Sequence, residues 1–568
     1  ILPSTQSIKD IQLNPIGQGQ GEMKPTGDKN TVMLFLAIAA LILLIACINF
    51  MNLATAKSTQ RAREVAMRKV LGARKNQLFT QFIGESVIIA LLGLVIALVI
   101  VEISLPAYNN ILGKALIFSF RDGFIISTLT VLVITVGILG GVYPAFVLSS
   151  FRPAKVLKAN KSAESSGSIA LRNILVIVQF SISVGLIVST ATVYGQMLYA
   201  TNKDPGFNKQ NLIVVKSIDR QGINDNKNSF KKEVNKLPMV TKSSFSSERP
   251  FSSNENNNSI SLPENTAAGS LLIGTVRVGY DFLETIETQL VVGRNFSLKH
   301  SSDHYPDSDK VKKGTMGQSS ILANESAIKR FGYGTPQQAL GKSVKKVIGG
   351  SEEEPIFGIF KIIGVVPDIH YQSMKRIVRP EIYYLREDAT NNLLIRYHGE
   401  PATALNEIKS IWSQFAAEIP FEFEYSEDLA AEEFQKERNI GSMLALFSSL
   451  AIIIACLGLF GLAYFTAARR TKEIGVRKVM GASSTQIVKL LIWQFSKPVL
   501  IANLIAWPIS SWAMLNWLEK FPVRLEAWFL IPMCLAAGFI AMSIAWITVG
   551  GNAAKVARAN PIKALRYE

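Results

Sequence analysis

Seven apolar stretches of about twenty or more residues constrain the fold of this chain most strongly. About 20 apolar residues in a helix cover the roughly 30 Å hydrocarbon core of a bilayer. The stretches alternate with strongly polar sequence, so we expect a multi-span α-helical membrane protein. Prolines inside a span are tolerated where neighbouring groups re-satisfy the backbone. The seven predicted transmembrane helices, three followed by four, are 31–53, 83–105, 124–149, 174–194, 440–467, 492–515 and 527–549.

The formal net charge of +17 is concentrated beside these stretches. Basic loops stay on the cytoplasmic side of a membrane, and here basic and nearly neutral loops alternate. This alternation accounts for the charge, which therefore does not indicate a nucleic-acid partner. The predicted cytoplasmic segments are 54–82, 150–173, 468–491 and the tail after Val549.

One segment occurs twice, with the two copies 409 residues apart. The first copy is 61–73 and the second is 470–482, and no gap is needed to align them. A repeat of this kind predicts two structurally equivalent halves. The candidate functional residues are the matched positions Arg61, Glu64, Arg68, Lys69, Gly72 and Ala73 in the first copy and Arg470, Glu473, Arg477, Lys478, Gly481 and Ala482 in the second.

The repeat also predicts the domain order. The second half has one span, a polar region of more than 230 residues and three further spans, whereas the first half shows three spans after thirty polar residues. We therefore expect 1–30 to be the remnant of a first extracytoplasmic domain, with its preceding span missing. The other expected parts are 31–170 (three spans), 171–203 (a span with a stalk), 204–437 (an α+β extracytoplasmic domain) and 438–568 (three spans).

Helical segments longer than a bilayer needs indicate that the stalk projects outward. Residues 171–203 would extend about 50 Å as a helix, and 426–467 also reads as one helix entering a span. In the external domain we expect strands at 212–215, 273–278, 356–366 and 381–385, helices at 226–237, 325–331 and 401–418, and mobile loops at 243–261 and 301–317. Short basic helices are expected at 151–158 and 560–566.

Several motifs that could carry chemistry are weak. Ala339–Ser343 ends like a phosphate-binding loop, but position 336 is Pro where that motif needs Gly. His300 and His304 have helical spacing around Asp303, yet the surrounding sequence favours a solvated loop over a metal site. Three cysteines, all inside predicted spans, provide neither a disulfide framework nor metal-ligand spacing.

Ionisable residues inside the predicted spans are Glu85, Glu102 and Lys497. Such residues raise the hypothesis of a transport pathway. However, Glu85 and Glu102 lie near opposite ends of their span, where their side chains can reach the interface. We therefore expect a membrane part that moves rather than one that conducts ions.

Two interpretations of the repeated segment remain open. In one, each copy is an interfacial helix held by charge to anionic lipid. In the other, each is a docking helix that fits a groove on a cytosolic partner. Duplication favours docking, because two equivalent helices match a symmetric dimer.

The repeated segment, placed after the first span of a three-span block, resembles the FtsX-like, MacB-type ABC transporter permease family. Residues 279–283 (Gly-Tyr-Asp-Phe-Leu) and 292–296 (Val-Gly-Arg-Asn-Phe) are similar to the periplasmic core domain of that family. The resemblance identifies 31–170 and 438–568 as two FtsX-like permease domains. This chain differs from MacB-type chains because no nucleotide-binding domain is fused to it.

The resemblance implies a permease subunit without enzyme activity, and without a cofactor in this chain. ATP and Mg²⁺ would be bound by a separate cytosolic ABC ATPase dimer that contacts both copies of the segment. Closure of that dimer would move the external domain and drive export or extraction of a substrate. The alternative is a regulatory protein that activates an extracytoplasmic partner such as a cell-wall hydrolase. Expected partners also include the lipid bilayer and a periplasmic adaptor or outer-membrane protein, and the expected location is the cytoplasmic (inner) membrane with the large domain in the periplasm.

Overall fold

The computed structural model describes residues 29–112, 116–119, 121–150, 166–252, 256–263, 269–307, 311, 316–351, 354–469 and 471–558. The chain divides into two compact units. The helical unit comprises Ile1–Gly195, Glu437–Trp517 and Glu526–Glu568, and the α/β unit comprises Gln196–Lys436 and Leu518–Leu525. The two basic tail helices predicted at 151–158 and 560–566, and residues 1–28, lie outside the described residues.

Seven helices in the described ranges are long and apolar enough to cross a membrane, which confirms the predicted number of spans. Pro144 lies inside the third of these helices, and Pro498 and Pro508 lie inside the sixth, as the sequence predicts. The helices extend beyond the predicted apolar stretches because polar turns continue at their ends. They are α2 (Lys29–Val70), α3 (Lys75–Leu112), α4 (Gly123–Ser150), α6 (Ser166–Asn202), α13 (Gln435–Arg469), α15 (Ser484–Leu518) and α16 (Leu530–Arg558).

The helical unit contains a four-helix set and a three-helix set. In the four-helix set, α6 packs on α13, α15 and α16 through small and β-branched residues such as Val184, Ala502 and Ala541. In the three-helix set, α4 contacts both α2 and α3. The close approach depends on glycine, because a Cβ at Gly137 would lie 2.7 Å from Val87 and one at Gly140 would lie 2.5 Å from Phe50.

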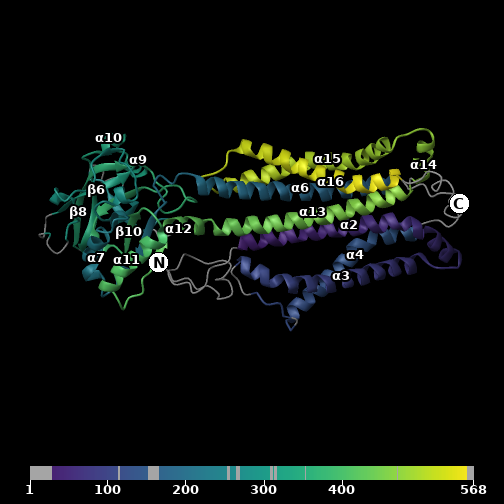
Figure 1. Ribbon diagram of the computed structural model, residues 1–568, viewed down its shortest axis with the longest axis horizontal. Helices are drawn as coiled ribbons and strands as arrows, with labels where there is room; N and C mark the ends of the chain where they lie inside the picture. The colour runs from purple at the N-terminus through teal and green to yellow at the C-terminus, as the bar shows by residue number, and fades with distance from the viewer. Residues whose placement is uncertain are drawn as a thin grey trace. The chain divides into compact units, whose positions relative to one another are not determined.

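The helices repeat with the spacing of the sequence. α3 begins at Lys75 and α15 begins at Ser484, which are 409 positions apart. α2 and α13, which the repeat matches to each other, lie side by side (Figure 1). Their contact includes the rings of Phe35 and Phe447, whose centroids are 6.1 Å apart, and Gly461, where a Cβ would lie 2.2 Å from Leu53.

The α/β unit is built on an eleven-stranded sheet in which six strands close into a ring. The ring runs β4–β3–β7–β8–β6–β9, and a parallel pairing between β9 and β4 closes it. β11, β1, β10 and β2 continue from β4 as an open sheet, and β5 pairs with β8. The strands are β1 (Leu212–Lys216), β2 (Val240–Ser246), β3 (Asn257–Ser261), β4 (Ser270–Val278), β5 (Val292–Gly293), β6 (Gly317–Asn324), β7 (Ser343–Gly350), β8 (Pro355–Val366), β9 (Glu381–Leu385), β10 (Asn392–Tyr397) and β11 (Phe423–Tyr425).

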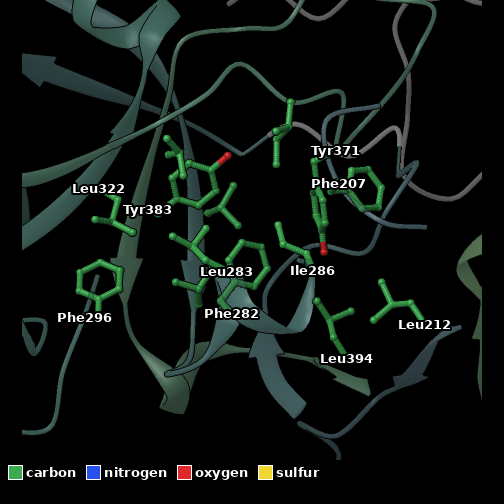
Figure 2. Close-up of a cluster of buried hydrophobic side chains, with 14 of the residues drawn as sticks. Phe207, Leu212, Phe282, Leu283, Ile286, Phe296, Leu322, Tyr371, Tyr383 and Leu394 are labelled. Atoms are coloured by element: carbon green, nitrogen blue, oxygen red, sulfur yellow. The ribbon is translucent and has the colours of Figure 1, made fainter. Parts of the chain in front are cut away.

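Three large buried clusters hold this unit together. One contains side chains of the ring strands, including Phe360 and Tyr384, and another packs α7 (Lys227–Val234) and α11 (Pro401–Phe415) on the open sheet. The third joins the two parts and includes Phe282, Leu283 and Phe296 (Figure 2). The motifs similar to the periplasmic core domain therefore contribute side chains to the core.

All four predicted strands and all three predicted helices of this domain are confirmed, including α9 (Glu325–Phe331) at its predicted bounds. The loop predicted at 243–261 is partly wrong. Its ends belong to β2 and β3, and Ser243, Ser244 and Ser246 are fully buried. The Ser/Asn-rich composition suggests exposure. However, β2 lies inside the sheet between β10 and β4, where these small side chains are buried.

The continuous helix predicted at 426–467 is also wrong. The structure has α12 (Ser426–Glu433), an interruption at Phe434, and then α13. Phe434 is buried in a small cluster with Met374 and Val523, and this packing favours a turn over continued helix. α6 is unbroken, and its residues from Gln196 onward belong to the α/β unit.

Candidate coupling site

The two copies of the repeated segment end in the same helix cap. In the first, Gly72 N–H donates to the Lys69 carbonyl (3.1 Å) and Ala73 N–H to the Arg68 carbonyl (3.0 Å). In the second, Gly481 N–H donates to the Lys478 carbonyl (3.0 Å) and Ala482 N–H to the Arg477 carbonyl (2.9 Å). These paired bonds define a Schellman cap, which needs a left-handed residue.

The glycines provide that conformation. Gly72 has φ +99° and Gly481 has φ +93°, and no atom lies within 4 Å of a Cβ built on either. The requirement is therefore for backbone conformation and not for space. After each turn a glutamine side chain caps the next helix, because Gln77 Oε1 accepts from Arg74 N–H (2.9 Å) and Gln486 Oε1 from Ser483 N–H (3.0 Å).

A buried apolar side chain anchors each segment to the spans of its own set. Val65 is 1% exposed and packs with Leu78 and Phe82 of α3 and with Ala145 of α4. Its counterpart Ile474, in α14 (Thr471–Val479), is 6% exposed and packs with Ile487 and Leu491 of α15 and with Ala553 of α16. A movement of either segment would therefore be transmitted to two spans.

The opposite face of each segment is apolar and exposed. Leu71 and Met480 are 81% and 83% exposed, and the matched pairs Met67/Val476 and Val70/Val479 are all more than half exposed. We call these two sets of three residues the apolar triads. An apolar patch rimmed by charge at the tip of a rigid turn is typical of a surface that contacts another molecule.

Charged residues flank the apolar triads in matching geometry. Arg68 Nη2 lies 2.7 Å from Glu64 Oε1, and Arg477 Nη2 lies 2.7 Å from Glu473 Oε1. Both pairs have i, i+4 spacing and exposed side chains, so they orient the arginines and contribute little to stability. Arg61 lies within α2, but its side chain, like Arg470, is outside the described part of the chain.

Lys69 takes a different role from its neighbours. Its Nζ donates to the carbonyl of Ser149 (2.6 Å), in the last turn of α4, where a cation is favoured by the helix dipole. Burial, and to a smaller extent repulsion from Lys75, lowers the pKa of Lys69. Lys69 thus holds the segment to α4.

The first copy has one polar link that the second lacks. Arg68 Nη1 donates to Gln81 Oε1 (3.1 Å), and Gln81 Nε2 donates to Glu85 Oε1 (3.2 Å). The corresponding positions in the second copy are Leu490 and Gln494. The two segments therefore share their backbone and their apolar triad but differ in how the arginine is supported.

The weak chemical motifs are absorbed into the fold of the α/β unit. Gly341 and Lys342 precede β7, a strand, whereas a phosphate-binding loop precedes a helix. Asp303 is fully buried and accepts two hydrogen bonds from Arg294 (2.7 and 2.8 Å), so the expected solvated loop is wrong at this position. Among the described residues, no group of three or more His, Cys, Asp and Glu could hold a metal ion.

Sequence reasoning found the matched residues but missed part of their arrangement. The sequence alone does not distinguish Val65, which is buried, from Val70 and Leu71, which are exposed. Met67 and Val476, which complete the apolar triads, were not singled out. Their spacing of three and four residues from Val70 and Leu71 was the available signal.

Comparison with known proteins is consistent with the repeat. The family described as FtsX-like permease C-terminal matches residues 36–153 and again 445–561. MacB, a macrolide export ATP-binding/permease protein of Bdellovibrio bacteriovorus, is 30% identical over 127 residues, 22% of this chain and 19% of that protein. The uncharacterized ABC transporter permease YknZ of Bacillus subtilis is 30% identical over 125 residues, 22% of this chain and 30% of that protein. These matches thus span about a fifth to a third of the relatives.

Two solved structures resemble the chain in part. One is the periplasmic region of MacB from Actinobacillus actinomycetemcomitans, with 14% identity, a TM-score of 0.26, and coverage of 40% of this chain and 94% of that chain. The other is the extracellular domain of YknZ, with 14% identity, a TM-score of 0.21, and coverage of 36% and 91%.

Proposed function

Because this chain carries two FtsX-like permease domains, we propose that it is the membrane subunit of an ABC transporter and couples ATP hydrolysis by a separate cytosolic ATPase dimer to movement of its α/β unit. The proposed outcome is export or extraction of a substrate at the outer face of the cytoplasmic membrane. The chain contributes the moving parts, and the partner would bind ATP and Mg²⁺.

The observation that carries this proposal is the pair of equivalent apolar triads. Each is presented by the same Schellman cap and anchored by the same buried position. A partner with two-fold symmetry offers two identical grooves, and two equivalent helices satisfy it where a single helix would leave one groove empty. An interfacial helix bound to lipid would not require this duplication.

The side of the membrane follows from charge in this proposal. Both repeated segments lie in strongly basic sequence and would face the cytosol by the positive-inside rule. Each three-span block of the repeat would end on the cytosolic side. The α/β unit follows one further span and would therefore stand on the opposite side. A periplasmic adaptor or outer-membrane protein could then be the next partner of the α/β unit.

The proposal predicts that the arginines beside the apolar triads are needed for coupling. The full chain is co-expressed with the ATPase that co-purifies with it, and ATP hydrolysis is measured in nanodiscs. The double change Arg68→Glu and Arg477→Glu is expected to abolish stimulation of hydrolysis, while the protein remains inserted. Unchanged stimulation would contradict docking through these segments.

A matched control uses a charge at the other end of a span. Arg121 is exposed in the short connection between α3 and α4, which the charge pattern assigns to the outer side. Arg121→Glu is expected to leave stimulation unchanged. If Arg68→Glu/Arg477→Glu retains stimulation but detaches the segments from anionic lipid, the interfacial interpretation replaces the docking one.

A further inference from the structure

The α/β unit contains a cavity of about 330 Å³ that the sequence does not predict. Its main wall is the segment 369–379, which connects β8 to β9, and the opposite wall includes Phe251 and Glu433. All of its lining residues belong to the α/β unit. A cavity of this volume is sufficient for a small ligand.

The charged lining of this cavity is cationic in effect. Lys375, Arg376 and Arg379 line it together with only two carboxylates, Glu381 and Glu433. Both carboxylates already have partners inside the protein, and one partner of Glu381 is Arg379 itself. Glu381 accepts from Arg379 Nε (2.7 Å) and from the Tyr383 hydroxyl (3.1 Å), and Glu433 accepts from Met374 N–H (3.0 Å) and from the Ser373 hydroxyl.

Packing fixes the position of Lys375. Lys375 Nζ lies 5.2 Å from the ring centroid of Phe434, which is buried, and the Lys375 N–H donates to Ser373 Oγ (3.0 Å). Arg376 is exposed at the rim. An acidic group that enters the cavity would thus meet oriented donors, which is the arrangement that makes charge-assisted hydrogen bonds strong.

The remaining lining is mixed, since Ser252, His370, Gln372 and Ser373 are polar and the other residues are apolar. Phe251, Ile369, Ile377 and Val378 contribute to the wall, and Ile377 is 81% exposed. An isoleucine this exposed, next to two cationic residues and at the edge of a cavity, provides a surface for an apolar group. The cavity therefore combines one cationic end with an apolar side.

The cavity segment is fastened to the end of α12. Glu433, the last residue of α12, holds Ser373 and Met374, and Phe434, which follows it, packs on Met374. The imidazole of His370 donates a hydrogen bond from Nδ1 to the Ser373 carbonyl (3.1 Å) and closes the turn. The shape of the cavity is therefore linked to the residues that immediately precede α13.

We propose that this cavity binds a small anionic amphiphile, with its acidic head group against Lys375 and Arg376 and its apolar chain against Ile377 and Val378. A cationic ligand does not match this lining. Ligand binding at this site does not require the ATPase. A negative result for the proposed function would therefore leave the prediction of ligand binding unchanged.

The test uses the full chain in phosphatidylcholine nanodiscs, without an ATPase, with empty nanodiscs as the reference for partition into lipid. Binding of octanoate is measured by calorimetry and compared with octylammonium, which reverses the head-group charge, and with acetate, which removes the chain. Octanoate is expected to bind with one site per chain, and the other two are expected not to bind. Equal binding of octylammonium, or no binding of octanoate, would overturn the proposal.

Variants locate the site. Lys375→Glu combined with Arg376→Glu is expected to lower octanoate affinity by at least about tenfold, and Ile377→Ser is expected to lower it by several fold. The control Lys329→Glu changes an exposed cation on α9, outside the cavity lining, and should retain full affinity. Octanoate binding that survives both cavity variants would place the ligand elsewhere and overturn the assignment.

Discussion

Asn49 of α2 lies directly against Gly458 of α13, and these two residues are each other's counterparts in the 409-residue repeat. A Cβ at Gly458 would come within 2.3 Å of Asn49 Oδ1, and the Asn49 amide donates to the carbonyl of Ile454 (2.9 Å). Two residues that a repeat matches to each other can be in contact only where they lie beside the two-fold axis that relates the two copies. The two sets of spans thus meet as an internal pseudo-dimer, which is the symmetry that two equivalent docking segments require.

This contact predicts a specific clash. Gly458→Ala places a methyl group where Asn49 Oδ1 lies and should destabilise the helical unit by about 1–3 kcal/mol, the usual cost of overpacking. Combining it with Asn49→Ala removes the obstacle and should recover most of the loss, even though the hydrogen bond to Ile454 is lost. Thermal unfolding in detergent provides the double-mutant cycle. Additive effects of the two changes would show that the residues do not meet.

The turn glycines predict a second, separable effect. Gly72→Ala and Gly481→Ala each force a Cβ into the left-handed region and should destabilise their turn by about 1 kcal/mol. Because the turn presents the apolar triad, stimulation of the partner ATPase should fall further in the double variant than in either single one. ATPase stimulation is normalised to the amount of membrane-inserted protein.

A third glycine is the matched control for this change. Gly84 lies within helix α3, its φ is not positive, and nothing lies within 4 Å of its Cβ position. Gly84→Ala should be neutral or stabilising by up to about 1 kcal/mol, since alanine favours helix. If Gly72→Ala behaves like Gly84→Ala, the left-handed turn is not essential to the segment.

The buried ion pair between Arg294 and Asp303 predicts a large loss on truncation. Asp303 is fully buried and also accepts from Ser297 N–H (3.1 Å), whereas Arg294 is 36% exposed. Burial alone would raise the pKa of Asp303, but hydrogen bonds from Arg294, Ser320 and Ser297, together with the charge of Arg294, outweigh it and lower the pKa below its usual value of 3.8. The stability from this pair is therefore present above about pH 4 and is lost on acidification below that value.

Asp303→Ala should lower the free energy of unfolding of the α/β unit by about 2–4 kcal/mol at neutral pH, because Arg294 keeps a charge without its partner. Urea unfolding followed by hydrogen exchange of β6 and β9 measures the loss. The exposed pair Lys236–Glu233, with side chains 62% and 41% exposed, is the control. Glu233→Ala should change stability by less than about 1 kcal/mol.

The sequence predicts the spans, the repeat and four of the eleven strands of the α/β unit because each depends on local pattern. Apolar length alone predicts a helix such as α15, and alternating or continuous apolar runs predict strands such as β8. The closed ring could not be predicted, because the β4–β9 pairing joins residues far apart in sequence. Strand pairing of this kind depends on tertiary contacts.

The misses in the candidate site have a similar cause. Whether Val65 or Val70 faces the spans depends on the rotation of one helix against α3 and α4, which no local pattern specifies. The interruption at Phe434 was missed because its sequence favours helix and the competing contacts come from Met374 and Val523, distant in the chain. Tertiary packing overrides local propensity at these positions.

The buried carboxyl of Glu248 predicts how the stability of the α/β unit depends on pH. Glu248 is 2% exposed, and its oxygens accept from Asn256 (3.0 Å) and Gln372 (2.7 Å). Burial, reinforced by Glu381, raises its pKa from 4.5 to about 7 despite Arg379, whose Nη2 lies 3.8 Å away. In the unfolded chain the same carboxyl ionises near pH 4.5.

The sign follows from these two values. Between about pH 4.5 and pH 7 the folded unit keeps a proton that the unfolded chain has lost, so the free energy of unfolding should fall as the pH rises through this interval. The total fall from Glu248 is roughly 3 kcal/mol. Glu248→Gln should flatten the profile, although Glu381 and Glu433, whose pKa values burial also raises, should leave a residual slope.

Urea unfolding at a series of pH values, read from hydrogen exchange of peptides that cover β9, measures this slope. Glu400→Gln, which changes an exposed carboxyl just before α11, serves as the control and should reproduce the wild-type profile. A wild-type profile that rises from pH 5 to pH 7 would contradict the prediction, because it would mean that Glu248 is ionised in the folded unit and held by Arg379. In that case Glu248→Gln would be strongly destabilising at pH 7, since it would leave Arg379 with Glu381 as its only carboxylate partner.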